Sequence, residues 1–255
     1  MIISFYEEFP KKSNLDKIKL INFPTKLYIA ASTLNEFQKI KKKIIKDYPQ
    51  QKKHIKEIVY WPVLTKKEGY WFSAFTQRKA LKRTIKELKG KDVPIMWDAE
   101  LPTHPNFLLY FTQFLNFLSN RRLINKFIKS HKKVYVAEYF FVNNWMSPLF
   151  RLLCLNFPPS YNISPMRMAY SSLHDFGNYL MEKEITKGKE EFGDKFIMGY
   201  GTLAVGILGW EKPMSLELLK RDFDLAQKHK LKEVALFRLG GLNKDYIKLI
   251  KNYTN

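Results

Sequence analysis

The sequence contains only one cysteine, Cys154, so it cannot form an internal disulfide bond. Cys154 lies within the apolar run 150–157, where a cysteine usually behaves as a small packed residue. No histidine or second cysteine stands at a spacing typical of a zinc site. The sequence therefore predicts neither a disulfide framework nor a bound metal or other cofactor.

Long uncharged apolar runs are also missing, and none is long enough to span a bilayer. At the N-terminus, Glu7 and Glu8 directly follow a short apolar run, which is unlike a secretory signal peptide. We therefore expect a cytoplasmic protein, and peripheral attachment at a membrane is left open.

Acidic residues are scarce, with 24 Asp and Glu against 44 Lys and Arg and a net charge of +20. Such a surplus suits an anionic partner, either a phosphorylated substrate, nucleic acid or an anionic membrane surface. Lysines scattered through nearly every amphipathic segment are equally typical of ordinary solvated helix faces. The aromatic residues are not interleaved with Lys and Arg as in a single-strand binding platform, so we do not expect nucleic acid as a partner.

No glycine-rich phosphate-binding fingerprint follows the first apolar run, and neither a linker nor a repeat divides the chain. Strand-like runs alternate instead with amphipathic helical stretches, at 2–9, 26–32, 57–64, 93–101, 133–141, 167–173, 195–207 and 233–241. Near-continuous apolar strands alternating with helices indicate parallel strands covered on both faces. Eight such units predict a single α/β domain over residues 1–255, a (β/α)8 TIM barrel. An open doubly wound sheet is the alternative.

Two connections are longer than usual, 65–76 after the third strand and 142–165 after the fifth. Both leave the strands at the end where a barrel builds its active site. The second connection and the stretch 105–118 are rich in aromatic and aliphatic residues. They could form a lid, a partner-binding face, a patch that lies on an anionic membrane, or a layer packed on the barrel.

The fourth strand ends in two acidic residues, Asp98 and Glu100. Residues two apart in a strand face the same way, so both side chains should point into the barrel mouth while Trp97 and Ala99 face the helices. Carboxylates gathered there raise one another's proton affinity, which suits a general acid, although some could simply pair with basic residues.

Other polar and aromatic residues are expected at the same rim. Trp61, Tyr70 and Trp71 provide flat rings that suit stacking on sugar faces or a local core. The remaining candidates stand at the ends of other strands: Glu7 or Glu8, Glu138, Tyr170, Tyr200, Arg238, Gly240 and Gly241.

Three short segments carry a resemblance to a known family. The segment "WDAELP" (97–102) resembles the end of the strand-four signature of family-18 glycoside hydrolases, the chitinase-like barrels, which reads D-x-x-D-x-D-x-E. The segments "MAY" (168–170) and "LFRLGGLN" (236–243) are similar to that family's sixth and eighth strands. Where the family has further aspartates, this chain has Val93, Met96 and Ser171.

The resemblance implies a carbohydrate or glycoconjugate substrate and a role for each matched residue. Glu100 would be the general acid, Asp98 would hold and polarise the N-acetyl group of the sugar, and Tyr170 would hydrogen-bond the same group. The carbonyl of that N-acetyl group would then be the nucleophile in place of a protein side chain.

Three alternatives stay open at this point. Glu100 and Glu138 could form a conventional retaining pair of carboxylates. A sugar-phosphate or phosphodiester enzyme could bind phosphate at the turns 199–202 and 238–243, with a metal held by Asp98, Glu138 and His174 if one is needed. A non-catalytic barrel could bind an anionic membrane surface or a protein partner.

Overall fold

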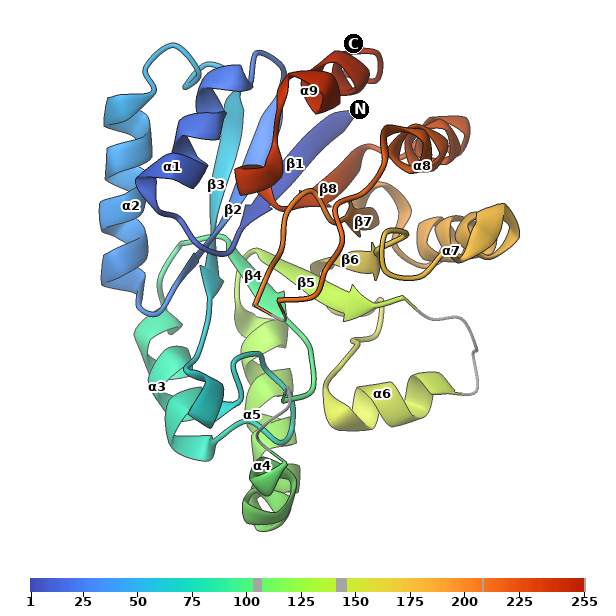
Figure 1. Ribbon diagram of the computed structural model, residues 1–255. Coiled ribbons are helices and arrows are strands. Elements are labelled where there is room, and N and C mark those ends of the chain that lie inside the picture. The colour runs from blue at the N-terminus through green and yellow to red at the C-terminus, as the bar shows by residue number, and fades with distance from the viewer. Residues whose placement is uncertain (103–106, 141–145, 208, 255) are drawn as a thin grey trace.

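Eight parallel strands close into a barrel in their order along the chain, so that β1 pairs with both β2 and β8. A computed structural model of the protein describes residues 1–102, 107–140, 146–207 and 209–254 (Figure 1). The strands are β1 (Ile2–Glu7), β2 (Thr25–Ala31), β3 (Ile55–Pro62), β4 (Ile95–Asp98), β5 (Val134–Tyr139), β6 (Ile163–Ala169), β7 (Ile197–Gly201) and β8 (Glu233–Phe237). The predicted (β/α)8 fold is confirmed.

The helices lie around the outside of this barrel (Figure 1). The longer ones are α2 (Leu34–Asp47), α3 (Arg78–Leu88), α5 (Phe117–Ser130), α7 (Gly177–Phe192), α8 (Leu216–Lys228) and α9 (Lys244–Lys251). Three shorter helices are α1 (Lys12–Leu15), α4 (Leu108–Thr112) and α6 (Ser147–Leu153). Among the described residues, no helix combines the length and the apolar character needed to cross a membrane.

Alternation along each strand separates an inner core from an outer one. In β4, Met96 packs with the inner cluster, whereas Trp97 belongs to the outer one. The Trp97 ring stacks on Phe72 with a centroid separation of 4.0 Å and packs against Phe127 of α5. This packing fixes the orientation of β4, because a shift of one residue would exchange its inner and outer side chains.

The strand bounds differ from the sequence-based expectation by several residues, and β6 and β7 differ most. Strand β6 begins at Ile163, inside the predicted connection 142–165, and contains Pro165. The proline is tolerated because β7 pairs with β6 only from Met166 onward, so Pro165 lies where β6 has one neighbour. Strand β7 ends at Gly201, and the chain then crosses the mouth of the barrel. Residues 142–145 of the predicted connection lie outside the described residues.

Candidate functional site

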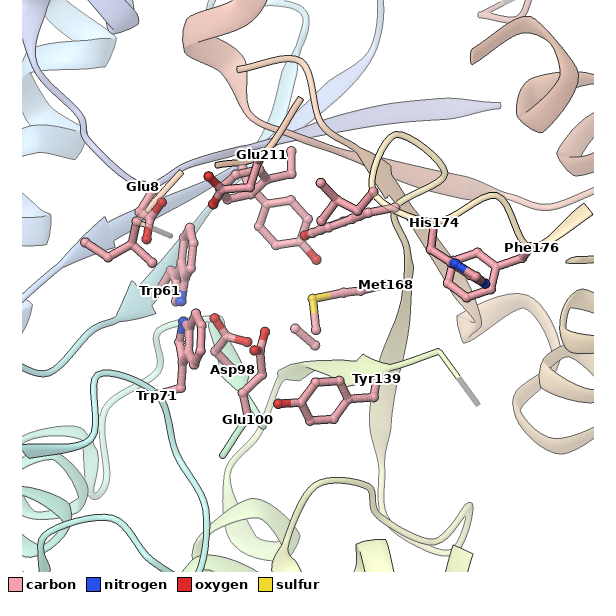
Figure 2. A pocket seen from close by; sticks show the side chains of 16 residues that line it. Glu8, Trp61, Trp71, Asp98, Glu100, Tyr139, Met168, His174, Phe176 and Glu211 are labelled. Carbon is pink, nitrogen blue, oxygen red and sulfur yellow. The ribbon is translucent and has the colours of Figure 1, made fainter. Parts of the chain in front are cut away.

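A cavity of about 250 Å³ opens at the carboxyl ends of the strands (Figure 2). Its walls combine aromatic, acidic and aliphatic side chains, contributed by Tyr6, Glu8, Trp61, Trp71, Asp98, Glu100, Ala137, Tyr139, Met168, Tyr170, Leu173, His174, Phe176, Ile207, Glu211 and Phe237. This is the end at which a (β/α)8 barrel places its active site.

Asp98 and Glu100 form one side of the cavity. Asp98 is the last residue of β4 and is 3% exposed, and Glu100 follows it with partial exposure. Figure 2 shows their carboxyl groups close together and pointing into the cavity. Burial raises the pKa of Asp98 well above its usual range, and the neighbouring Glu100 and Glu8 carboxylates raise it further. Burial likewise raises the pKa of Glu100, to about 7. The pair can therefore hold a proton at neutral pH.

Glu8 and Glu211 face the first pair from another side of the cavity (Figure 2). Glu8 follows β1, and its Oε1 accepts a hydrogen bond of 2.7 Å from the Tyr70 hydroxyl group. Burial raises the pKa of Glu8 to about 7. Among the residues that the structure describes, those that line the cavity include four acidic residues and neither lysine nor arginine. The cavity of this basic protein is thus itself acidic.

Aromatic rings form much of the remaining wall. Tyr6 contacts Trp61 edge to face at 5.7 Å between centroids, and Tyr170 stacks on Phe237 at 5.8 Å. Burial raises the pKa of Tyr170 above its usual value, so its hydroxyl group keeps its proton and can donate a hydrogen bond. Flat apolar faces beside polar groups are typical of sites that bind small polar ligands.

The structure brings five of the predicted site residues into the cavity lining: Trp61, Trp71, Asp98, Glu100 and Tyr170. Tyr70 lies behind the lining, where its hydroxyl group holds Glu8. Tyr200 is fully buried on the outer side of β7 and packs against Phe223 of α8.

Four other predicted site residues lie outside the lining and hold the last turn of the barrel in place: Glu7, Arg238, Gly240 and Gly241. The Glu7 carboxylate is 0% exposed and accepts hydrogen bonds from the Gly240 backbone amide at 2.7 Å and from Arg238 at 3.1 Å. A Cβ atom on Gly241 would lie 1.9 Å from the Leu203 carbonyl oxygen, so this glycine is needed for a close backbone contact. The Glu7 carboxylate therefore already binds the turn 238–243, where the sugar-phosphate alternative would place a phosphate group.

Glu138 points away from the cavity. Its carboxylate is 1% exposed and accepts hydrogen bonds from Arg167 Nε at 3.0 Å and from the Phe157 amide at 3.2 Å. Its neighbour Tyr139 lines the cavity instead, because adjacent strand residues face opposite sides. Neither the retaining pair of Glu100 with Glu138 nor the metal set that included Glu138 is therefore assembled.

Several lining residues were not predicted. Glu8 was named only as an alternative to Glu7, although its position two residues after the inward-facing Tyr6 places it on the inner face. The same alternation would have found Tyr139 from Ala137. Glu211 comes from the irregular segment between β7 and α8, where no periodic signal indicates it.

No family model matches the sequence, and no curated protein does so either. Solved structures are similar over the whole chain. The glycoside hydrolase domain of PgaB from Bordetella bronchiseptica is 10% identical with a TM-score of 0.60, and the match covers 100% of this chain and 98% of that one.

Two chitinases are similar in the same way. The chitinase from Chromobacterium violaceum is 13% identical with a TM-score of 0.54, and 98% of each chain is covered. The family-18 chitinase from Cycas revoluta, solved with allosamidin, is 12% identical with a TM-score of 0.51 and full coverage of both chains. The chain is a divergent (β/α)8 barrel with the fold of the chitinase-like glycoside hydrolases.

Proposed function

We propose that the protein is a glycoside hydrolase that binds a carbohydrate or glycoconjugate in this cavity and uses Glu100 as its general acid. The observation that carries the proposal is the Asp98–Glu100 pair at the end of β4, set among aromatic rings. The pKa of Glu100, raised by burial to about 7, leaves it partly protonated at neutral pH. An acid with such a pKa is well suited to proton donation under physiological conditions.

The lining residues suit the steps of glycoside hydrolysis. Trp61 and Trp71 offer flat faces against which a sugar ring can pack. Glu100 would donate its proton to the glycosidic oxygen as the bond to the anomeric carbon breaks. Positive charge then develops on the sugar, and the fraction of Glu8 that is ionised at neutral pH would stabilise it.

The nucleophile in this proposal belongs to the substrate. Glu138 is held by Arg167 on the outer side of β5 and cannot attack the sugar. The resemblance to family-18 enzymes implies that an N-acetyl carbonyl of the substrate attacks while Asp98 polarises it. Tyr170 lines the cavity with a protonated hydroxyl group that can bind the same carbonyl.

The phosphoester alternative has less support. A phosphate group would meet four acidic side chains and no lysine or arginine in the described lining. Those of the carboxyl groups that are ionised would repel a phosphate group in a site withdrawn from water. The turn containing Gly240 is already occupied by the Glu7 carboxylate.

Turnover of a panel of oligosaccharides and alkyl glycosides, whose leaving groups are poor, by Glu100→Gln tests the proposal. We expect kcat to fall by about 10² to 10⁴, the usual contribution of a general acid. Glu190→Gln is the matched control, because Glu190 is exposed on α7 and should leave kcat unchanged. Turnover by Glu100→Gln at the wild-type rate would contradict the assignment. Sugar binding without any turnover by the wild type would favour a non-catalytic barrel.

A further inference from the structure

A ridge of large apolar side chains stands out from the surface between β4 and the first turn of α5. It consists of Phe107, Leu108, Phe111, Phe114, Leu115 and Leu118, in α4 and the residue before it, the 3-10 turn Phe114–Asn116 and the first turn of α5. Their exposed fractions run from 58% for Phe107 and Leu118 to 93% for Leu115. Soluble proteins rarely expose so many large apolar residues together unless the surface binds something.

The ridge is held firmly by its other face. Leu109 is 4% exposed, and Gln113 is buried with its Oε1 accepting a hydrogen bond of 3.1 Å from the Arg78 amide. Asn120 of α5 is fully buried and donates hydrogen bonds to backbone carbonyls of the connection after β3. The apolar side chains are therefore exposed on an anchored segment, which lies at the edge of the molecule farthest from α9 and the C-terminus (Figure 1).

Basic residues continue the ridge along α5. Along α5, intervals of three and four residues place Leu118, Arg122, Lys126 and Lys129 on one face, and all four are exposed. The row changes from apolar to basic at Arg122, which lies roughly 6 Å along the helix from Leu118. No aspartate or glutamate occurs between Glu100 and Glu138 in the sequence. The segment that carries the ridge and the basic row therefore favours an anionic partner.

We propose that this ridge binds the surface of an anionic lipid membrane. Its apolar side chains would enter the boundary between headgroups and acyl chains, and Arg122, Lys126 and Lys129 would contact lipid phosphates. Because the cavity is acidic, the surplus of basic residues has no role in substrate binding. Binding to an anionic membrane would give these residues a role.

Other occupants fit these features less well. A second copy of the chain would bring two basic rows together, which repel one another. Leu115 is almost fully exposed, so it protrudes, as expected of a side chain that inserts into lipid rather than one that lines a groove for a protein partner. Because the segment follows β4, binding would hold the cavity mouth close to the membrane surface.

Flotation of the protein with vesicles at low salt tests the proposal. We expect binding to vesicles of phosphatidylcholine with roughly one-third phosphatidylglycerol, and at least about tenfold weaker binding to phosphatidylcholine alone. Two double variants should each weaken binding at least about tenfold. The first combines Phe111→Ser with Leu115→Ser, and the second combines Arg122→Glu with Lys126→Glu. Lys248→Glu with Lys251→Glu, which makes the same charge change on exposed residues of α9, should bind like the wild type.

The four residues substituted in the ridge and the basic row are all exposed, so the midpoint of thermal unfolding should stay at the wild-type value and separate lost binding from lost folding. Failure of the wild type to bind anionic vesicles at low salt would overturn the proposal. Wild-type binding by both the ridge variant and the basic-row variant would do the same. A dimer in sedimentation that Phe111→Ser with Leu115→Ser converts to monomer would instead make the ridge an interface between copies.

Discussion

The Glu8 carboxyl group makes the stability of the fold depend on pH. Burial raises its pKa from 4.5 to about 7 in the folded protein. The folded state therefore keeps a proton that the unfolded state has released across this interval, and stability falls as pH rises through it. A shift of this size corresponds to about 3 kcal/mol lost above neutral pH.

Glu8→Gln should remove this loss, because the glutamine stays neutral and its carbonyl oxygen can still accept the Tyr70 hydrogen bond. We expect the variant to be more stable than the wild type by about 1–3 kcal/mol above neutral pH, with the gain shrinking as the pH approaches 4.5. Urea unfolding at several pH values measures the difference. An identical pH dependence in the two proteins would show that Glu8 has no raised pKa.

At the scale of elements, the Glu7 carboxylate joins the start of the chain to its last turn. It binds Arg238 and the Gly240 amide, and Asn14 of α1 donates to the same carboxylate at 3.1 Å. Glu7→Ala should lower the free energy of unfolding by about 3–5 kcal/mol, because it leaves a guanidinium group without its buried partner. Chemical denaturation measures this, with the exposed Glu190→Ala as the control. A loss below about 1 kcal/mol would contradict the anchoring role.

The order and kind of the elements could be predicted from the sequence, because eight apolar runs alternate with amphipathic helices. The direction of side chains at the strand ends could be predicted only where the register was evident. In β4 the pair Asp98 and Glu100 was placed correctly at the mouth. The predicted site residues Glu7 and Glu138 are each one residue away from Glu8 and Tyr139, which line the cavity. A shift of one residue along a strand makes the side chain point to the opposite face.

Contacts between segments that are far apart in the sequence could not be predicted from sequence patterns. Glu211 joins the cavity from an irregular segment after β7, and Ser171 donates a hydrogen bond of 2.8 Å to Asp222 on α8. Neither contact follows a spacing that the sequence displays, since both depend on how the closed barrel brings separate connections together.

At the scale of the whole molecule, charge is divided between two places. The chain as a whole has a net charge of +20, although its cavity lining holds four acidic residues and, in its described part, no lysine or arginine. The excess of basic residues therefore lies outside the cavity. The surface charge therefore favours an anionic partner outside the cavity, and the cavity favours a neutral or cationic substrate. If the apolar ridge and the basic row face a membrane, one barrel would bind an anionic membrane on its surface and a neutral or cationic substrate in its cavity.

The most direct test of the central claim compares leaving groups in Glu100→Gln. A glycoside that releases a strongly acidic phenol needs little help from an acid, whereas one that releases an alcohol or a weakly acidic phenol needs full protonation. We predict that the variant loses about 10² to 10⁴ in kcat/KM on substrates with poor leaving groups and no more than about tenfold on activated ones. An equal loss on both classes, or no loss on either, would contradict the role of Glu100 as the acid.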